Sequence, residues 1–274
     1  VQRQVDRMRI ALLALTTLFA ACQSAPELGT RTSSEGGANL ASQSQTERPA
    51  PTPFVEQPGS LVDHRVPQLP EFGQPATKAA TKLLELADTI DRSRTDTAYS
   101  HATHVRRKQG IYHFDCSGMV SWMLDRVAPT ALASIGRERP VAASYVRVIE
   151  KAPTDKARRG WQRIADIDDV RPGDLFAWRR PASWPKGGNT GHVGIVLAKP
   201  EPVPELADAY VVRILDSTRW AHQYDSRDED ETGFGTGTIL VMTDGAGKGI
   251  GYGWHGTASR GWNETDVVFG RISK

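Results

Sequence analysis

The chain has few of the features that mark nucleic-acid-binding, membrane-spanning or nucleotide-binding proteins. Its formal net charge is only +2 over 274 residues, and no lysine–arginine run is present, so no nucleic-acid partner is expected. The apolar run at residues 10–21 is too short to span a bilayer. The glycine-rich residues 245–253 fit neither common phosphate-binding spacing and predict a turn. His101 and His104 have no accompanying metal motif, and neither a metal nor another cofactor is expected.

The N-terminal segment has the composition of a secretory signal. Three arginines precede the apolar run, which ends in small residues before Cys22. This ending resembles a bacterial lipobox, which implies that residues 1–21 are removed and that Cys22 is lipidated. The resemblance places the protein in a bacterial cell envelope, anchored to the membrane through this lipid. The residues after Cys22 favour the periplasmic face of the outer membrane.

The next segment predicts a disordered linker. Residues 22–75 are rich in Ser, Gly, Pro, Gln and Thr and have no sustained apolar period, so they cannot bury enough surface to fold. All seven tryptophans and all six tyrosines lie at Tyr99 or later. Residues 76–274 are therefore expected to form one folded domain.

Within this domain the hydrophobic period changes from helical to strand-like. Apolar residues at helical spacing predict helices at residues 76–90, from Cys116 onward, and at 142–152. Helices followed by strands predict an α+β domain with an antiparallel sheet. The predicted strands are residues 174–178, 192–198, 210–217, 237–244 and 266–273.

Cys116 is the only cysteine besides Cys22, and it opens a predicted helix. A thiol at a helix start faces free N–H groups and the positive end of the helix dipole, which lowers its pKa and favours a thiolate. A lone cysteine is more often a buried, inert residue. The polar neighbours Asp115 and Ser117 shift the balance toward a nucleophile.

A base and a residue to orient it follow on the predicted strands. His192 opens one apolar strand, and Asp216 ends the next one along the chain. Neighbouring antiparallel strands can hold the carboxylate beside the imidazole, where it fixes the tautomer and stabilises the imidazolium. The order Cys116, His192, Asp216 predicts cysteine-nucleophile catalysis.

Four motifs in this order, FDCSGMVSWML, RPGDLFAW, GHVGIVL and ILDST, resemble those of the NlpC-type cell-wall cysteine peptidases. The resemblance covers about residues 95–220. It implies a papain-like α+β domain, with helices packed on an antiparallel sheet and the nucleophile at a helix N-terminus. It also implies hydrolysis of amide bonds in peptidoglycan stem peptides, commonly between D-glutamate and a diamino acid, by a monomeric enzyme.

Carried over by position, Cys116 matches the nucleophile and His192 the base. Asp216 falls where the family has its third polar residue, which is more often histidine, and His222 is the alternative. Backbone N–H groups at the helix start are expected to hold the oxyanion.

The same resemblance suggests residues that contact the substrate. Relatives have a tyrosine upstream of the nucleophile, for which Tyr99 and Tyr112 are the candidates. Asp115 and Ser117 are expected either to contact substrate or to cap the helix. Arg179, in a polar loop, is expected to bind stem carboxylates unless the loop is merely solvated. Two other functions stay open: acyl transfer or hydrolysis of another amide or ester, and non-catalytic binding to the cell wall by a lipoprotein.

Overall fold

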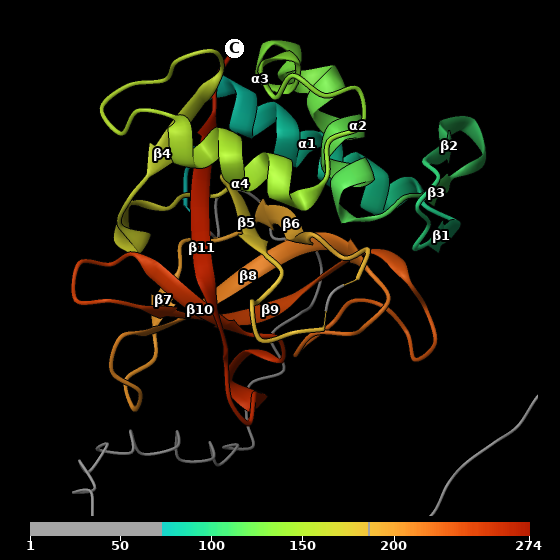
Figure 1. Ribbon diagram of the computed structural model, residues 1–274. Coiled ribbons are helices and arrows are strands. Elements are labelled where there is room, and N and C mark those ends of the chain that lie inside the picture. Colours follow the sequence, from blue (N-terminus) through green and yellow to red (C-terminus); the bar gives the residue numbers. More distant parts are fainter. Residues whose placement is uncertain (1–72, 186) are drawn as a thin grey trace, which may run out of the picture. The chain divides into compact units, whose positions relative to one another are not determined.

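The computed structural model describes residues 73–185 and 187–274, all within one unit that spans Pro49–Lys274 (Figure 1). The predicted signal segment, Cys22 and residues 22–72 of the predicted linker lie outside the described residues. The helices are α1 (Lys78–Ser93), α2 (Cys116–Val127), α3 (Pro129–Ser134) and α4 (Ala142–Lys151), with 3₁₀ turns η1 (Arg107–Gln109), η2 (Ile167–Asp169) and η3 (Gly256–Ala258). The first strands are β1 (Asp96–Ala98), β2 (His104–Arg106), β3 (Ile111–His113), β4 (Trp161–Ile164) and β5 (Leu175–Arg179). The others are β6 (Gly191–Val196), β7 (Glu201–Pro202), β8 (Ala209–Thr218), β9 (Gly233–Thr243), β10 (Gly249–Gly253) and β11 (Asn263–Ile272).

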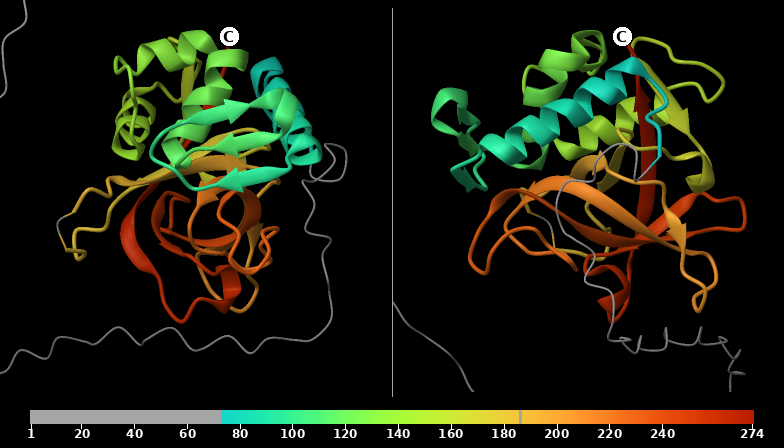
Figure 2. Two further views of the ribbon diagram at one scale, coloured as in Figure 1. Left: turned by 90° about the vertical axis from the view of Figure 1, so that its right-hand side faces the viewer. Right: turned by 180° about the vertical axis from the view of Figure 1, so that it is seen from behind.

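Six antiparallel strands close into a barrel. Their hydrogen-bonded order is β10-β9-β8-β6-β5-β11, and β11 also pairs with β10, which joins the two ends. β4 pairs with β11 and the short β7 with β8, outside this ring. β1, β3 and β2 form a separate small sheet. In Figure 1 the helices lie above β8, β9 and β10, while β11 runs upward past α4 toward the C-terminus; the right-hand view of Figure 2 shows the same arrangement.

This closed barrel shows that the expected fold class, a papain-like α+β domain with helices packed on an antiparallel sheet, is wrong. The prediction failed at residues 245–253, where many glycines predicted a turn. Part of this segment is β10, the strand that closes the barrel. A Cβ at Gly251 would overlap the indole ring of Trp262. Close packing therefore requires glycine here, and glycine hides the side-chain alternation by which a strand is predicted.

The hydrophobic core has two parts, one inside the barrel and one between the barrel and the helices. Along β6, Val193 and Ile195 pack with the helices, whereas Val196 packs inside the barrel. Successive side chains of a strand point to opposite faces, so His192 shares the barrel face with Val196. The main residues inside the barrel are Phe176, Trp178, Val196, Val212, Ile214, Ile239, Val241, Tyr252, Val267 and Phe269.

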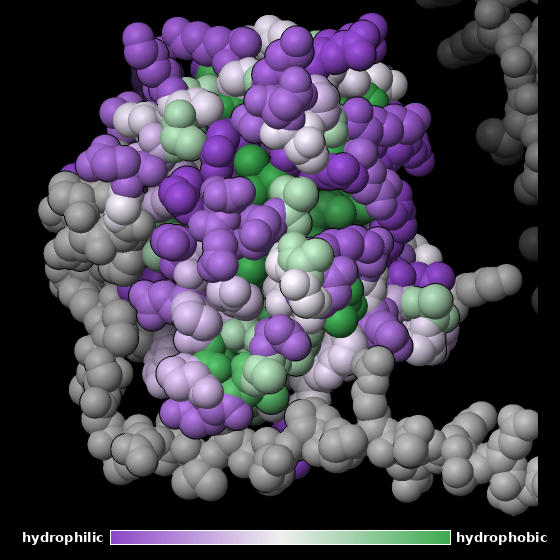
Figure 3. Space-filling view, turned by 90° about the vertical axis from the view of Figure 1, so that its left-hand side faces the viewer, coloured by the Kyte–Doolittle hydropathy of each residue, from purple (hydrophilic) through white to green (hydrophobic). Residues whose placement is uncertain are grey.

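The helix that begins at Cys116 is confirmed. Its predicted apolar face, Met119, Val120, Met123, Leu124 and Val127, is buried against the core. Among the described residues, no helix is long and apolar enough to cross a membrane. On the face shown in Figure 3, hydrophilic residues predominate and hydrophobic ones show mainly in the gaps between them.

Candidate active site at the start of helix α2

Asp115 caps the N-terminus of α2. Its Oδ1 accepts hydrogen bonds from the Gly118 N–H at 2.6 Å and from the Ser117 hydroxyl at 2.9 Å. Its Oδ2 lies 3.2 Å from Nδ1 of the exposed His101. Such a cap satisfies N–H groups that have no partner inside the helix, which contributes about 1 kcal/mol. Asp115 and Ser117 are thus engaged in holding the helix start, the second of the two roles expected for them.

The Cys116 thiol is nearly buried, with 7% of the residue exposed. The backbone N–H groups of Val193 and Ser117 lower the pKa of the thiol. The pKa of the Cys116 thiol is nevertheless raised to about 12, mainly by burial. The negative charges of Asp115 and Asp216 also raise it, against the effect of the two N–H groups. The expected resting thiolate is therefore wrong, and the group rests as a thiol at neutral pH.

His192 and Asp216 form a buried pair on neighbouring strands. His192 Nε2 lies 2.6 Å from Asp216 Oδ2, and the two residues are 8% and 0% exposed. β6 and β8 pair only through residues 195–196 and 214–215, so the two side chains meet just beyond the end of the ladder. The strand order brings them together as the sequence predicted. Helix α2 packs against β6, with Cys116 and Val193 in the same core cluster. The negative charge of Asp216 raises the pKa of the thiol, so the carboxylate of the pair lies within electrostatic reach of Cys116.

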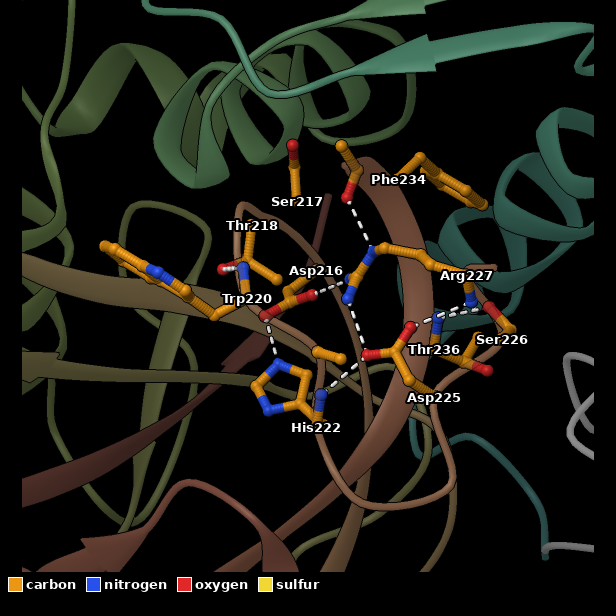
Figure 4. Close-up of polar contacts among 12 residues, drawn as sticks. Asp216, Ser217, Thr218, Trp220, His222, Asp225, Ser226, Arg227, Phe234 and Thr236 are labelled. Atoms are coloured by element: carbon orange, nitrogen blue, oxygen red, sulfur yellow. Dashed lines mark hydrogen bonds and ion pairs between the residues drawn. The ribbon is translucent and has the colours of Figure 1, made fainter. Parts of the chain in front are cut away.

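Asp216 has two further partners (Figure 4). His222 Nε2 lies 2.8 Å from the same Oδ2, and the Arg227 guanidinium donates to Oδ1. Arg227 also donates to Asp225 Oδ2 at 2.7 Å and to the Gly233 carbonyl at 3.0 Å. Burial alone would raise the pKa of Asp216, but its electrostatic interactions with His222 and Arg227 and the histidine hydrogen bonds hold it well below its usual value. Asp216 is therefore ionised at neutral pH.

His222, the alternative third residue in the sequence, joins Asp216 and does not replace it. Its ring is fully buried, its Nδ1 lies 3.1 Å from the Trp254 carbonyl oxygen, and its centroid lies 4.1 Å from that of Trp254. Its backbone N–H donates to Asp225 at 2.7 Å. The sequence did not identify Asp225, Arg227 or Trp254 as part of the site. Asp225 and Arg227 are polar residues of a loop, and such residues are usually solvated.

The three groups His192, Asp216 and His222 could also be considered as metal ligands, since one ligand atom of each lies within 4.8 Å of the others. The contacts of 2.6 and 2.8 Å have the lengths of hydrogen bonds. Two ligands held tetrahedrally about 2.1 Å from a zinc ion would lie roughly 3.4 Å apart. A guanidinium on the same carboxylate also opposes a cation there. The geometry fits a hydrogen-bonded network.

The structure brings Tyr99 toward the thiol. The residue follows β1 and is half-buried. The pKa of Tyr99 is raised to about 12, mainly by burial, and also by the charge of Asp115 and, when the thiol is ionised, by that of Cys116. The Arg219 guanidinium lies 5.1 Å from the Tyr99 ring centroid. Tyr112 instead belongs to the core, with its hydroxyl 3.1 Å from that of Ser93.

Arg179 lies at the end of β5 but is engaged elsewhere. Its guanidinium donates two hydrogen bonds of 2.7 Å to Glu150 of α4. Two cavities of about 370 and 380 Å³ lie on other parts of the described surface, and neither is lined by Cys116 or His192. The candidate site is thus identified by its chemical groups, with Tyr99 at its edge.

Comparison with known proteins gives one informative match. No family model and no solved structure matches the chain. The uncharacterized protein R653 of Acanthamoeba polyphaga mimivirus is 30% identical over 159 residues, which cover 51% of this chain and 67% of the viral protein. The chain belongs to the family of this viral protein. The expected membership of the NlpC-type peptidases is therefore wrong, and a viral relative also counts against a bacterial lipoprotein.

Proposed function

We propose that the protein is a cysteine hydrolase that cleaves an amide bond, with Cys116 as nucleophile, His192 as base and Asp216 as the residue that orients the base. One observation carries the proposal: His192 Nε2 and Asp216 Oδ2 are 2.6 Å apart in a buried pair, and the charge of Asp216 acts on the Cys116 thiol at the start of α2. A free cysteine packed only for its volume requires neither a base nor an ionised carboxylate next to it, and burying such a pair is costly.

We assign the path of the proton from the contact between His192 and Asp216. Nε2 of His192 is bonded to Asp216, so Nδ1 is the nitrogen that takes the thiol proton as the Cys116 sulfur attacks the carbonyl carbon. His192 then delivers this proton to the leaving amine, and the acyl group stays on sulfur as a thioester. Water attacks the thioester, gives its proton to His192, and releases the acid while the thiol is restored.

Two features of the fold assist this reaction. The Cys116 N–H is the first amide of α2 and has no partner inside the helix, so it is available for the oxyanion. One such donor is typically worth about 3 kcal/mol in the transition state. The ionised Asp216 stabilises the imidazolium that forms at His192 during the attack. The pKa of about 12 for the resting thiol means that His192 removes the proton during the attack.

The substrate class rests on weaker support than the chemistry. Peptidoglycan stem peptides were expected only from the motif resemblance, so they are one candidate among amides. Acyl transfer from the same thioester to an amine would use the same three residues. Non-catalytic binding would require none of them to be ionised or aligned.

The test is to trap the covalent intermediate. The full chain would be incubated with stem-peptide muropeptides, unrelated peptide amides and activated esters, and its intact mass measured with and without an added amine acceptor. We expect an acyl adduct on Cys116, lost in Cys116→Ala and kept in Cys22→Ala, the matched change at the other cysteine. Cleavage that persists in Cys116→Ala, or no adduct and no turnover with any substrate, would contradict the proposal.

A further inference from the structure

His222 has an unusual set of hydrogen-bond partners, because both of its ring nitrogens face acceptors. Nδ1 lies 3.1 Å from the carbonyl oxygen of Trp254, and a carbonyl oxygen can only accept. Nε2 lies 2.8 Å from Oδ2 of Asp216, and an ionised carboxylate can only accept. A neutral imidazole has one N–H and one lone pair, so it would leave one of these contacts without a proton. Both contacts are satisfied only when each nitrogen carries a proton.

We propose that His222 is a buried imidazolium and that it acts as a positioning residue, which fixes Asp216 and limits the basicity of His192. The charges around its ring support this state. Two carboxylates and two cations meet here. The carboxylates are Asp216 of β8 and Asp225 of the loop after it, and the cations are Arg227 of the same loop and His222 itself. His192 faces this group from β6. Gly237 of β9 and Trp254 complete the surroundings without charge.

This arrangement assigns one proton state to each group. Two cations and two carboxylates balance one another, so His192 can stay neutral and donate from Nε2 to Asp216. Its Nδ1 then keeps a free lone pair. A second cation at His192 would lie within 4.8 Å of the His222 nitrogen. A like charge at such a separation disfavours the second cation. The charged His222 thus opposes a resting thiolate–imidazolium pair and leaves His192 free to take a proton during the attack.

The inference rests on the proposed function for its consequence, but its central claim is tested without any substrate. In the full chain labelled with ¹⁵N-histidine, we expect the His222 ring to show two protonated nitrogens at pH 7 and the His192 ring to show one. A His222 ring with a single protonated nitrogen would overturn the proposal whether or not the protein is a hydrolase. The measurement uses the unaltered chain, so it does not depend on a variant that folds.

A second experiment tests the effect on the reactive pair. In a Cys22→Ala background Cys116 is the only thiol, and its alkylation by iodoacetamide is followed from pH 5 to 10. His222→Gln removes the charge, so we expect His192 to become more basic and alkylation at pH 6.5 to be about tenfold faster, a shift of about one pH unit. His255→Gln, at an exposed histidine beside Trp254, is the matched control and should leave the profile unchanged. An unchanged or slower rate in His222→Gln would overturn the proposal.

Discussion

Asp216→Asn tests the buried network most directly, because it removes one charge and keeps the shape. In the native protein Asp216 is fully buried and contacts His192, His222 and Arg227. Breaking such a buried ionic contact from one side costs about 3 to 5 kcal/mol, since the partner charges are left uncompensated. For a domain of this size each kcal/mol corresponds to about 2 to 4 °C, so we expect the melting temperature to fall by about 6 to 20 °C at pH 7.

The pH dependence of this loss has a defined sign. The pKa of Asp216 is held well below its usual value, so its stabilisation is complete above the unfolded-state value of about 3.9 and is lost as the pH falls toward the folded-state value. The difference in melting temperature between the native chain and Asp216→Asn should therefore shrink between pH 4 and 3.

Thermal unfolding followed by circular dichroism measures both effects. Asp266→Asn is the matched control, because Asp266 pairs with Lys248 at 2.9 Å and each side chain is 51% exposed. An exposed pair of this kind contributes about 0 to 1 kcal/mol. The reasoning would be refuted if Asp216→Asn melted within about 2 °C of the native protein at pH 7. A shift that small is no larger than the loss of one exposed pair could give. A difference that stays constant down to pH 3 would refute it as well.

Three further changes test the helix cap, the barrel closure and the outlying arginine. Asp115→Ala removes the cap of α2 and should lower the free energy of unfolding by about 1 kcal/mol in urea titrations; an unchanged midpoint would contradict the capping role. Gly251→Ala should destabilise the chain by about 1 to 3 kcal/mol, because its Cβ would overlap an indole ring, whereas Gly245→Ala meets open space and serves as the control. Arg179→Ala breaks a partly exposed pair with α4 and should leave Cys116 acylation unchanged; a loss of acylation would return this residue to the site.

Local patterns in the sequence predicted the parts of the site that depend on the hydrophobic period of a helix and on the order of strands along the chain. The apolar face of α2 follows from helical spacing after Cys116, and the meeting of His192 with Asp216 follows from two consecutive strands that end in polar residues. These features need only short-range information, because a helix face repeats every 3.6 residues and neighbouring strands are commonly consecutive.

The closure of the barrel and the second layer of the site could not be predicted in the same way. The glycines of β10 lie where a Cβ would meet a neighbour: Gly251 against Trp262, Gly249 against Val267 and Gly253 against Ser259. That packing is a property of the folded state. Arg227 and Asp225 lie in a loop whose composition is that of a solvated turn. The state of the Cys116 thiol also depends on burial, which outweighs the two N–H groups that lower its pKa.

The position of β11 has a consequence for synthesis of the chain on the ribosome. β11 pairs with β4, β5 and β10, and the carbonyl of its residue Ile272 accepts a hydrogen bond of 2.7 Å from the hydroxyl of Thr77, which caps α1. Until β11 leaves the ribosome, β5 and β10 each expose an unpaired edge, and such edges can pair with other chains. The nascent protein must therefore complete its sheet in one late step that joins the first helix of the described domain to its final strand.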